Sequence, residues 1–181
     1  GKTTHIAELM GDEGKIWACD RAASRLKKVT NNAQRLQLDS IETCVGDARD
    51  LSQFENTADR VLIDAPCSGL GTLHRRADLR WRQTPENLVE LANLQQEILT
   101  AAATWVKPNG ILVYATCTLN PLENEEVMQA FLTNHPQWQI EPPPESFPAP
   151  SLVSRFGWLK VIPTEHNSDG FFMVRLRHPK I

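Results

Sequence analysis

Short apolar segments alternate with amphipathic helical patterns along the chain, and this alternation constrains the fold more than any other feature. Residues 21–38 and 85–106 carry apolar side chains at helical spacing, and the apolar runs around them are short. Such an alternation predicts an α/β fold in which a mostly parallel sheet has helices on both faces. Four short apolar runs end in turn or polar residues, as buried strands do: 15–20, 41–46, 58–66 and 110–118.

Capping residues indicate where two of the helices begin. Thr84 is expected to cap the helix that starts at Pro85, because proline is favoured at the first helical position. A further helix is expected over residues 121–133, with Asn120 as its cap and Glu123 completing a variant of the capping box.

The segment EPPPESFPAP, residues 141–150, holds five prolines in ten residues and is therefore expected to form an extended loop. Two runs after it are typical of strands, WLKVIP at 158–163 and GFFMVRLR at 170–177. The second is expected to be the last strand of the sheet. Asp169 and Gly170, in front of that strand, could shape the rim of a site or form a simple turn.

The composition is that of one globular domain. With 181 residues, of which 41% are hydrophobic, the chain can bury a sizeable core, and residues 1–181 are treated as one domain. No apolar run could span a bilayer and no cationic leader is present, so we expect neither a membrane nor a secretory context. The net charge of −3 argues against nonspecific binding to nucleic acid, so a polyanion would need a local patch.

The cysteine pattern indicates the compartment. The four cysteines lie far apart, form no C-x-x-C pair and do not resemble a small disulfide scaffold, so a reducing cytoplasm is expected. The five histidines show no metal-ligand spacing either, and we expect no metal site.

The first residues, GKTT at positions 1–4, resemble the end of a loop that holds phosphate or another nucleotide-like group. They could complete a P-loop, and Asp64 in VLIDAP would then fit the magnesium-binding strand of a nucleoside triphosphatase. That interpretation gives no role to PCSGLGT, residues 66–72, which places a thiol and two glycines on the turn after the strand. There a backbone can approach a substrate closely.

Two carboxylates follow the first two expected strands. Ligands of such sheets bind beyond the carboxyl ends of the strands, where an acidic residue commonly accepts hydrogen bonds from a ribose. Asp20 is in position for this role, or it could cap the helix that follows. Asp47 could accept a hydrogen bond from an adenine amine, or it could end its strand in a turn.

Two cysteines follow the other two strands. A single cysteine at a strand end is more often a small buried hydrophobic residue than a nucleophile. Cys67 and Cys117, however, follow strands that are expected to be neighbours, and this arrangement favours thiol chemistry.

Four segments together carry a family resemblance: DAPCSGLGT, TPENLVELANLQQEIL, GILVYATCTLNPLENEEV and DGFFMVRL. In this order they resemble the RNA cytosine-5 methyltransferases of the Sun/Fmu family, and most closely its bacterial 16S ribosomal RNA members. The resemblance covers essentially the whole chain, and the paired PC and TC cysteines are its most specific part. It implies a Rossmann-like fold that uses S-adenosylmethionine. It also implies that GKTT ends the cofactor loop, with the first strand and the start of that loop absent from residues 1–181.

The resemblance further implies a covalent mechanism. C5 of cytosine is a poor nucleophile, and a thiolate that adds to C6 activates it. The family assigns this addition to the TC cysteine, here Cys117, and associates the PC cysteine, here Cys67, with product release. Asp64 matches a position that contacts the base and the cofactor, and a carboxyl that donates a proton there would need burial. Cofactor binding is carried over to Lys2, Asp20, Asp47 and Asp64.

The segment HRRADLRWRQ, residues 74–83, lies on the RNA path of the family. Its arginines could bind phosphates while Trp81 stacks on an extruded base. Alternatively the segment is a solvated loop that Trp81 anchors to the core. The residues expected to bind RNA are Arg75, Arg76, Arg80, Trp81 and Arg82.

The resemblance also implies an N-terminal RNA-binding domain in the full-length protein and ribosomal RNA as the substrate. We further expect a monomer. Three other functions remain open at this point. They are a P-loop nucleoside triphosphatase, a noncatalytic RNA-binding relative, and a thiol oxidoreductase that uses Cys67 and Cys117 as a redox pair.

Overall fold

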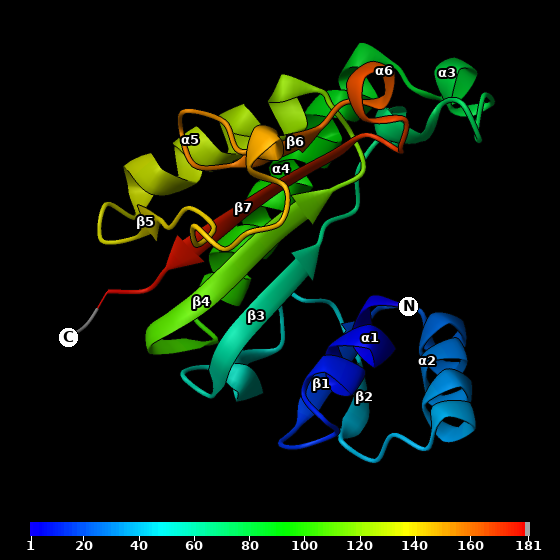
Figure 1. Cartoon of the computed structure of the whole chain (residues 1–181), viewed down its shortest axis with the longest axis vertical. Coiled ribbons are helices and arrows are strands. Elements are labelled where there is room, and N and C mark those ends of the chain that lie inside the picture. Colours follow the sequence, from blue (N-terminus) through cyan, green and yellow to red (C-terminus); the bar gives the residue numbers. More distant parts are fainter. Residues whose placement is uncertain (180–181) are drawn as a thin grey trace. The chain divides into compact units, whose positions relative to one another are not determined.

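The computed structural model describes residues 1–179 and divides the chain into two compact units (Figure 1). The first unit runs from Gly1 to Ser52, and the second begins at Gln53. Each unit has its own sheet.

The first unit is a small parallel α/β unit. Helix α1 (Lys2–Leu9) precedes strand β1 (Ile16–Asp20), and helix α2 (Ala23–Leu36) connects β1 to strand β2 (Ile41–Val45). The two strands pair in parallel, with Cys19 opposite Cys44. The strands predicted at 15–20 and 41–46 are therefore confirmed, as is the helix between them.

The second unit contains a mixed sheet whose strand order is β3-β4-β7-β5, with β6 also paired to β7. Strands β3 (Ala58–Asp64) and β4 (Val106–Thr116) are parallel, as expected. Strand β7 (Phe171–Arg177) runs antiparallel to β4 and to its other partners, β5 (Gln139–Ile140) and β6 (Leu159–Val161). The last strand of the chain is thus an interior strand of this sheet.

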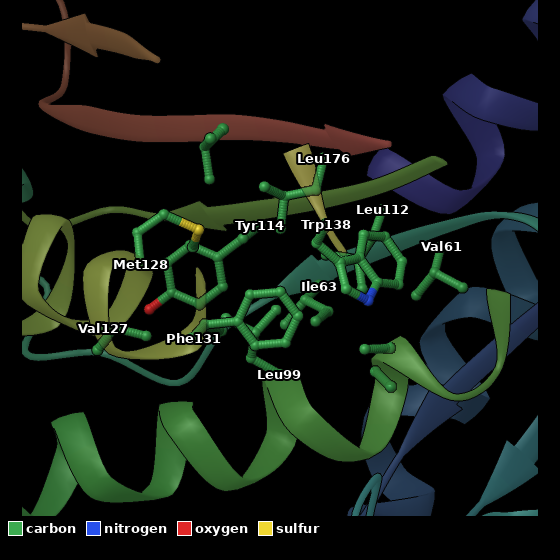
Figure 2. Packing of buried hydrophobic residues seen from close by; sticks show 14 of the residues in the cluster. Val61, Ile63, Leu99, Leu112, Tyr114, Val127, Met128, Phe131, Trp138 and Leu176 are labelled. Atoms are coloured by element: carbon green, nitrogen blue, oxygen red, sulfur yellow. The ribbon is translucent and has the colours of Figure 1, made fainter. Parts of the chain in front are cut away.

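Helices α4 (Pro85–Ala103) and α5 (Glu125–Asn134) pack on the face of the sheet that carries Leu112 and Tyr114. Figure 2 shows Tyr114 beside Phe131 of α5 and Leu99 of α4, with Leu112 next to Trp138. Leu99, Leu112, Tyr114 and Phe131 are all fully buried. Burial of each large apolar side chain contributes roughly 1.5–3 kcal/mol, so this layer fixes the helices on the sheet. The remaining elements are short: η1 (Ser52–Phe54), η2 (Leu70–Thr72), α3 (Leu79–Arg82), η3 (Pro121–Glu123), η4 (Pro150–Leu152) and α6 (Pro163–His166).

One helix start was predicted correctly and the other was not. The Thr84 hydroxyl accepts a hydrogen bond from the Asn87 amide at 3.2 Å, as expected of the cap of α4. The helix predicted over 121–133 is interrupted, because Asn120 caps only the short turn η3 and α5 begins at Glu125. The capping box is wrong, because the Glu123 carboxylate is fully buried and binds Ser68 instead.

The proline-rich segment behaves as predicted, since residues 141–149 form neither helix nor strand. Within residues 1–179, no helix has both the length and the apolar character needed to cross a bilayer.

Candidate active site

The neighbouring strands β3 and β4 each end next to a cysteine. Asp64 at the end of β3 lies opposite Ala115 of β4, and the Ala65 amide continues the pairing by donating to the Ala115 carbonyl at 2.9 Å. Beyond the ends of the two strands the backbone turns, and Cys67 Sγ lies 3.4 Å from Cys117 Sγ. The structure therefore brings together two predicted thiols that are fifty residues apart in the sequence.

The two thiols are partly buried. The hydrogen bond with Cys117, together with burial, raises the pKa of the Cys67 thiol far above its usual range. Cys67 therefore keeps its proton at neutral pH and can donate a hydrogen bond to the sulfur of Cys117.

Glycines shape the turn that carries Cys67. Gly69 has a φ of +73°, a conformation that other residues rarely adopt. The Gly71 amide donates to the Cys117 carbonyl at 2.9 Å, and the Gly71 carbonyl accepts from the Gly170 amide at 2.7 Å. A Cβ on Gly71 would lie 2.3 Å from the Gly170 carbonyl oxygen, so no larger residue fits. A close backbone approach to a substrate was expected at this turn. The structure instead shows the Gly71 backbone in close contact with the backbones of Cys117 and Gly170.

Polar residues beneath the thiols form a buried network that we did not predict. Ser68, Thr118, Glu123 and Asn124 are buried, and hydrogen bonds connect their side chains to both cysteine turns. One sequence signal could have indicated it, because each of the two cysteines is followed directly by a hydroxyl residue.

Asp64 is exposed at the end of β3. The burial that a proton-donating carboxyl would need is therefore not observed, and this part of the expectation is not supported. Its position near the carboxyl end of the strand is as predicted.

In the first unit, Asp20 ends β1 with both carboxylate oxygens engaged. One oxygen accepts from the Ala22 amide at 2.7 Å and the other from an Arg25 nitrogen at 3.4 Å. The first bond holds the turn before α2, but Asp20 does not cap that helix, because its N-cap is Ala22 and no side chain makes a capping bond there. The second partner, Arg25, has an exposed side chain, whereas the Asp20 side chain is 27% exposed.

Asp47 follows β2 and binds Arg49 through both oxygens, at 2.9 Å and 2.7 Å. Arg21 adds a weaker contact at 3.6 Å. The hydrogen bonds from Arg49 hold the pKa of Asp47 well below its usual range, so the group is an anion at neutral pH. A ligand amine would share this carboxylate with Arg49.

Two acceptors at the ends of parallel strands fit the ribose and adenine ends of an adenosine-containing cofactor. Lys2 is exposed in the first turn of α1. Of the expected cofactor loop, the described residues contain only the last part, GKTT.

The arginine-rich segment, residues 74–83, is anchored to the core by Leu79 and not by Trp81. Leu79 of α3 is buried, whereas the neighbouring Trp81 is 84% exposed. The alternative in which Trp81 anchors the segment to the core is therefore wrong. An exposed indole remains available for stacking.

Two of the predicted RNA-binding arginines have acidic partners. Arg75 pairs with Asp169, which His74 also contacts at 3.2 Å, and Arg82 pairs with Asp78 at 3.1 Å. Arg76 and Arg80 are exposed. Among residues 1–179, no group of three histidine, cysteine or acidic side chains could hold a metal ion.

Parallel strands with connecting helices, acidic residues at the strand ends and the antiparallel strand β7 beside β4 are the arrangement of Rossmann-like methyltransferases. The solved structure of NSun6 from Pyrococcus horikoshii with SFG has this fold, with a TM-score of 0.86 and 32% identity. The match covers 100% of this chain and 46% of that one. The predicted fold class is thereby confirmed.

The family model for the 16S rRNA methyltransferase RsmB/F matches residues 1–177, and the chain belongs to this family. The probable ribosomal RNA small subunit methyltransferase B of Synechocystis is 49% identical over 180 residues, which cover 98% of this chain. The corresponding Bacillus subtilis protein is 38% identical over 182 residues, again 98% of the chain. The chain spans about 40% of the length of these curated relatives. Family membership excludes the alternative of a P-loop nucleoside triphosphatase.

Proposed function

We propose that this chain carries the catalytic residues for S-adenosylmethionine-dependent methylation of C5 of a cytosine in small-subunit ribosomal RNA. The observation that carries the proposal is the 3.4 Å separation of Cys67 and Cys117 at the ends of β3 and β4. The family description supports ribosomal RNA as the substrate. The NSun6 relative, solved with the S-adenosylmethionine analogue SFG, supports the cofactor.

The proposed reaction begins at Cys117. Its thiolate adds to C6 of the cytosine, and the electron pair released toward C5 makes that carbon nucleophilic. S-adenosylmethionine supplies a methyl group on a positively charged sulfur, which leaves as a neutral thioether. A base, supplied by water in the site, then takes the C5 proton. The electron pair of that C–H bond re-forms the C5–C6 double bond, and the Cys117 sulfur leaves C6 as a thiolate.

Cys67 is proposed to assist the last step. Its raised pKa keeps a proton on the thiol, and its sulfur lies within hydrogen-bonding distance of Cys117. A hydrogen bond from the Cys67 thiol stabilises the departing Cys117 sulfur as a thiolate, which favours its departure over renewed attack on the product. Asp64, the last residue of β3, is proposed to contact the base and the cofactor.

Lys2, Asp20 and Asp47 are proposed to hold the cofactor, with Asp20 on the ribose and Asp47 on the adenine end. Asp20 has an oxygen whose present partner is the exposed Arg25, which a ribose hydroxyl can replace.

RNA binding is proposed for the segment around α3. The exposed Trp81 can stack on a base. Arg76 and Arg80 form no ion pair within residues 1–179 and can bind phosphates directly. Arg75 and Arg82 would exchange acidic partners for phosphate. For the whole protein we propose a cytoplasmic monomer in which an N-terminal domain shares RNA binding.

The test uses the whole protein with small-subunit ribosomal RNA and S-adenosylmethionine, followed by a denaturing gel. Cys67→Ala should accumulate a covalent protein-RNA band, because release is slowed, and Cys117→Ala should give none. Cys44→Ala, which removes a thiol from β2, is the matched control and should behave as the unmodified protein. Absence of a band from Cys67→Ala, in protein that binds both ligands, would contradict the mechanism; reversible disulfide formation without methylation would favour the redox alternative.

A further inference from the structure

A second link joins the two cysteine turns beside the contact between the thiols. Ser68 directly follows Cys67 and Thr118 directly follows Cys117. The hydroxyl oxygens of Ser68 and Thr118 lie 2.9 Å apart and both residues are buried. Whatever holds this hydroxyl pair also holds the two sulfur atoms near each other.

The Glu123 carboxylate holds the Ser68 side of this link. One carboxylate oxygen accepts from the Ser68 amide at 2.8 Å, and the other accepts from the Ser68 hydroxyl at 2.5 Å. Gln95 donates a third bond at 3.0 Å and also donates to the Pro66 carbonyl at 2.8 Å. All three bonds come from neutral donors, and Glu123 is fully buried.

These bonds give the hydroxyl pair a defined direction. Because the Ser68 hydroxyl donates to Glu123, it accepts from the Thr118 hydroxyl. The Thr118 oxygen in turn accepts from the Asn120 amide at 3.3 Å. The carboxylate therefore orders a chain of donors that runs from the Cys117 turn to the Cys67 turn.

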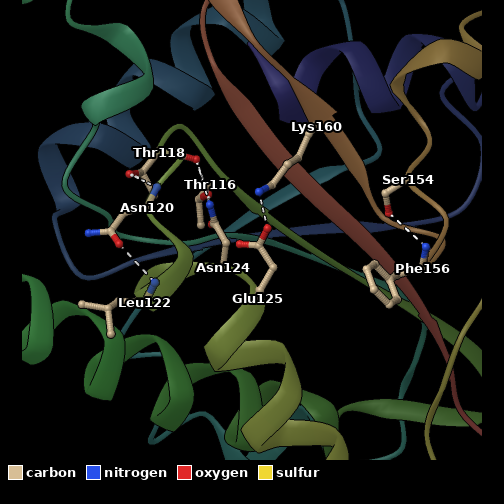
Figure 3. Close-up of polar contacts among 9 residues, drawn as sticks. All are labelled: Thr116, Thr118, Asn120, Leu122, Asn124, Glu125, Ser154, Phe156 and Lys160. Carbon is tan, nitrogen blue, oxygen red and sulfur yellow. Dashed lines mark hydrogen bonds and ion pairs between the residues drawn. The ribbon is translucent and has the colours of Figure 1, made fainter.

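Asn124, the next residue, holds the Cys117 side. Its side-chain oxygen accepts from the Thr116 hydroxyl at 2.6 Å, and its nitrogen donates to the Thr118 carbonyl at 3.0 Å. Figure 3 shows Asn124 directed at both threonines, which flank Cys117. Residues 123 and 124 thus bind one cysteine turn each, at the place where the expected helix is interrupted.

We propose that Glu123 and Asn124 form a positioning clip that keeps Cys67 within reach of Cys117 for the release step. The inference rests on the proposed function of the two cysteines. A buried carboxylate with only neutral donors is costly, and apolar residues would pack the same space at lower cost. Its position accounts for its presence, because no other described side chain bonds to both the amide and the hydroxyl of Ser68.

The test compares Glu123→Gln with Glu126→Gln in the whole protein. Both carboxylate oxygens of Glu123 accept hydrogen bonds from donors of Ser68. A glutamine side chain would replace one of these oxygens by an NH2 group, which cannot accept, so at least one bond to Ser68 is lost. Glu126 is exposed on α5 and undergoes the same chemical change without touching the cysteine turns. Glu123→Gln should accumulate the covalent protein-RNA band about tenfold above the level of Glu126→Gln, as Cys67→Ala does.

A second readout does not depend on methylation. Diamide takes up the two electrons and two protons that Cys67 and Cys117 lose when they form a disulfide. With both turns held in place the disulfide should form readily, and Glu123→Gln should slow it about tenfold. A purely structural role for Glu123 would not move this rate in protein that remains folded.

Ser68→Ala covers the case in which Glu123→Gln does not fold. It removes the hydroxyl but keeps the amide bond to Glu123, and it should give the same two effects to a smaller extent. Unchanged adduct levels and disulfide rates in a folded variant would overturn the clip. Absence of an adduct from Cys67→Ala itself would instead overturn the proposed function, while the disulfide rates would still test the clip.

Discussion

The strand-end residues of the two units differ in their surroundings. In the first unit, Asp20 and Asp47 interact with arginines at the surface, Arg25 and Arg49. In the second unit, Cys67 and Cys117 are adjacent in the chain to residues of a buried network, in which neutral donors surround Glu123. Surface ion pairs adjust at little cost, whereas a buried network holds one geometry. The comparison suggests that the first unit is suited to exchange a ligand and the second to position reacting atoms.

The largest effect is expected on the stability of the second unit, at the backbone contact between Gly71 and Gly170. Gly71→Ala would place a Cβ 2.3 Å from the Gly170 carbonyl oxygen and 2.8 Å from that of Cys117. Because backbone atoms cannot yield as a flexible side chain can, we expect a loss of about 2–3 kcal/mol in the free energy of unfolding. Denaturant unfolding measures it. A stability near that of the unmodified protein would mean that these backbones are not in close contact.

An intermediate effect is expected on the exposed side. Asp20→Ala removes the proposed ribose acceptor and should weaken S-adenosylmethionine binding about tenfold, while RNA binding stays nearly intact. Calorimetric titration of the cofactor, with RNA binding measured in parallel, tests this. Unchanged cofactor affinity would remove the assignment of Asp20 and leave it only the turn before α2.

The smallest effect concerns the dependence of stability on pH. Hydrogen bonds from Arg49 lower the pKa of Asp47 in the folded protein. The ionised side chain therefore stabilises the fold fully at pH values above the pKa of Asp47 in the unfolded chain, about 3.9. This stabilisation is lost as the pH falls through the pKa of Asp47 in the folded protein. Asp47→Asn should therefore cost less than about 1 kcal/mol at pH 7, and this difference should shrink below about pH 4. Unfolding at several pH values, with added salt, measures it. A difference that persists in acid would assign Asp47 a buried role like that of Glu123.

The sequence predicted the strands and most helices because their signals are local. Apolar runs, Thr84 and Pro85 act within a few residues, and β3, β4 and α4 follow from them. The antiparallel placement of β7 could not be predicted in this way, because it depends on pairing with β4 some sixty residues earlier. Strand type is local information, whereas strand order is not.

The site shows the same division. Cys67 and Cys117 could be identified because each follows an apolar run, and the structure brings them together. Glu123 was misassigned because the sequence ENEE presents three similar glutamates at a helix start. Only contact with Ser68, fifty-five residues earlier, distinguishes the buried one from its exposed or half-buried neighbours. The exposure of Trp81 depends likewise on tertiary contacts, here those of Leu79.

The backbone bonds among Gly71, Cys117 and Gly170 also have a consequence for biosynthesis. The ribosome makes the chain from its first residue, so both cysteines leave the exit tunnel before Gly170 does. Until that residue is available, the turn that carries Cys67 lacks the strand segment that closes it. The backbone closure of that turn is therefore completed only when synthesis of this part of the chain is nearly finished, whereas the hydrogen bonds of Glu123 and Asn124 can form earlier.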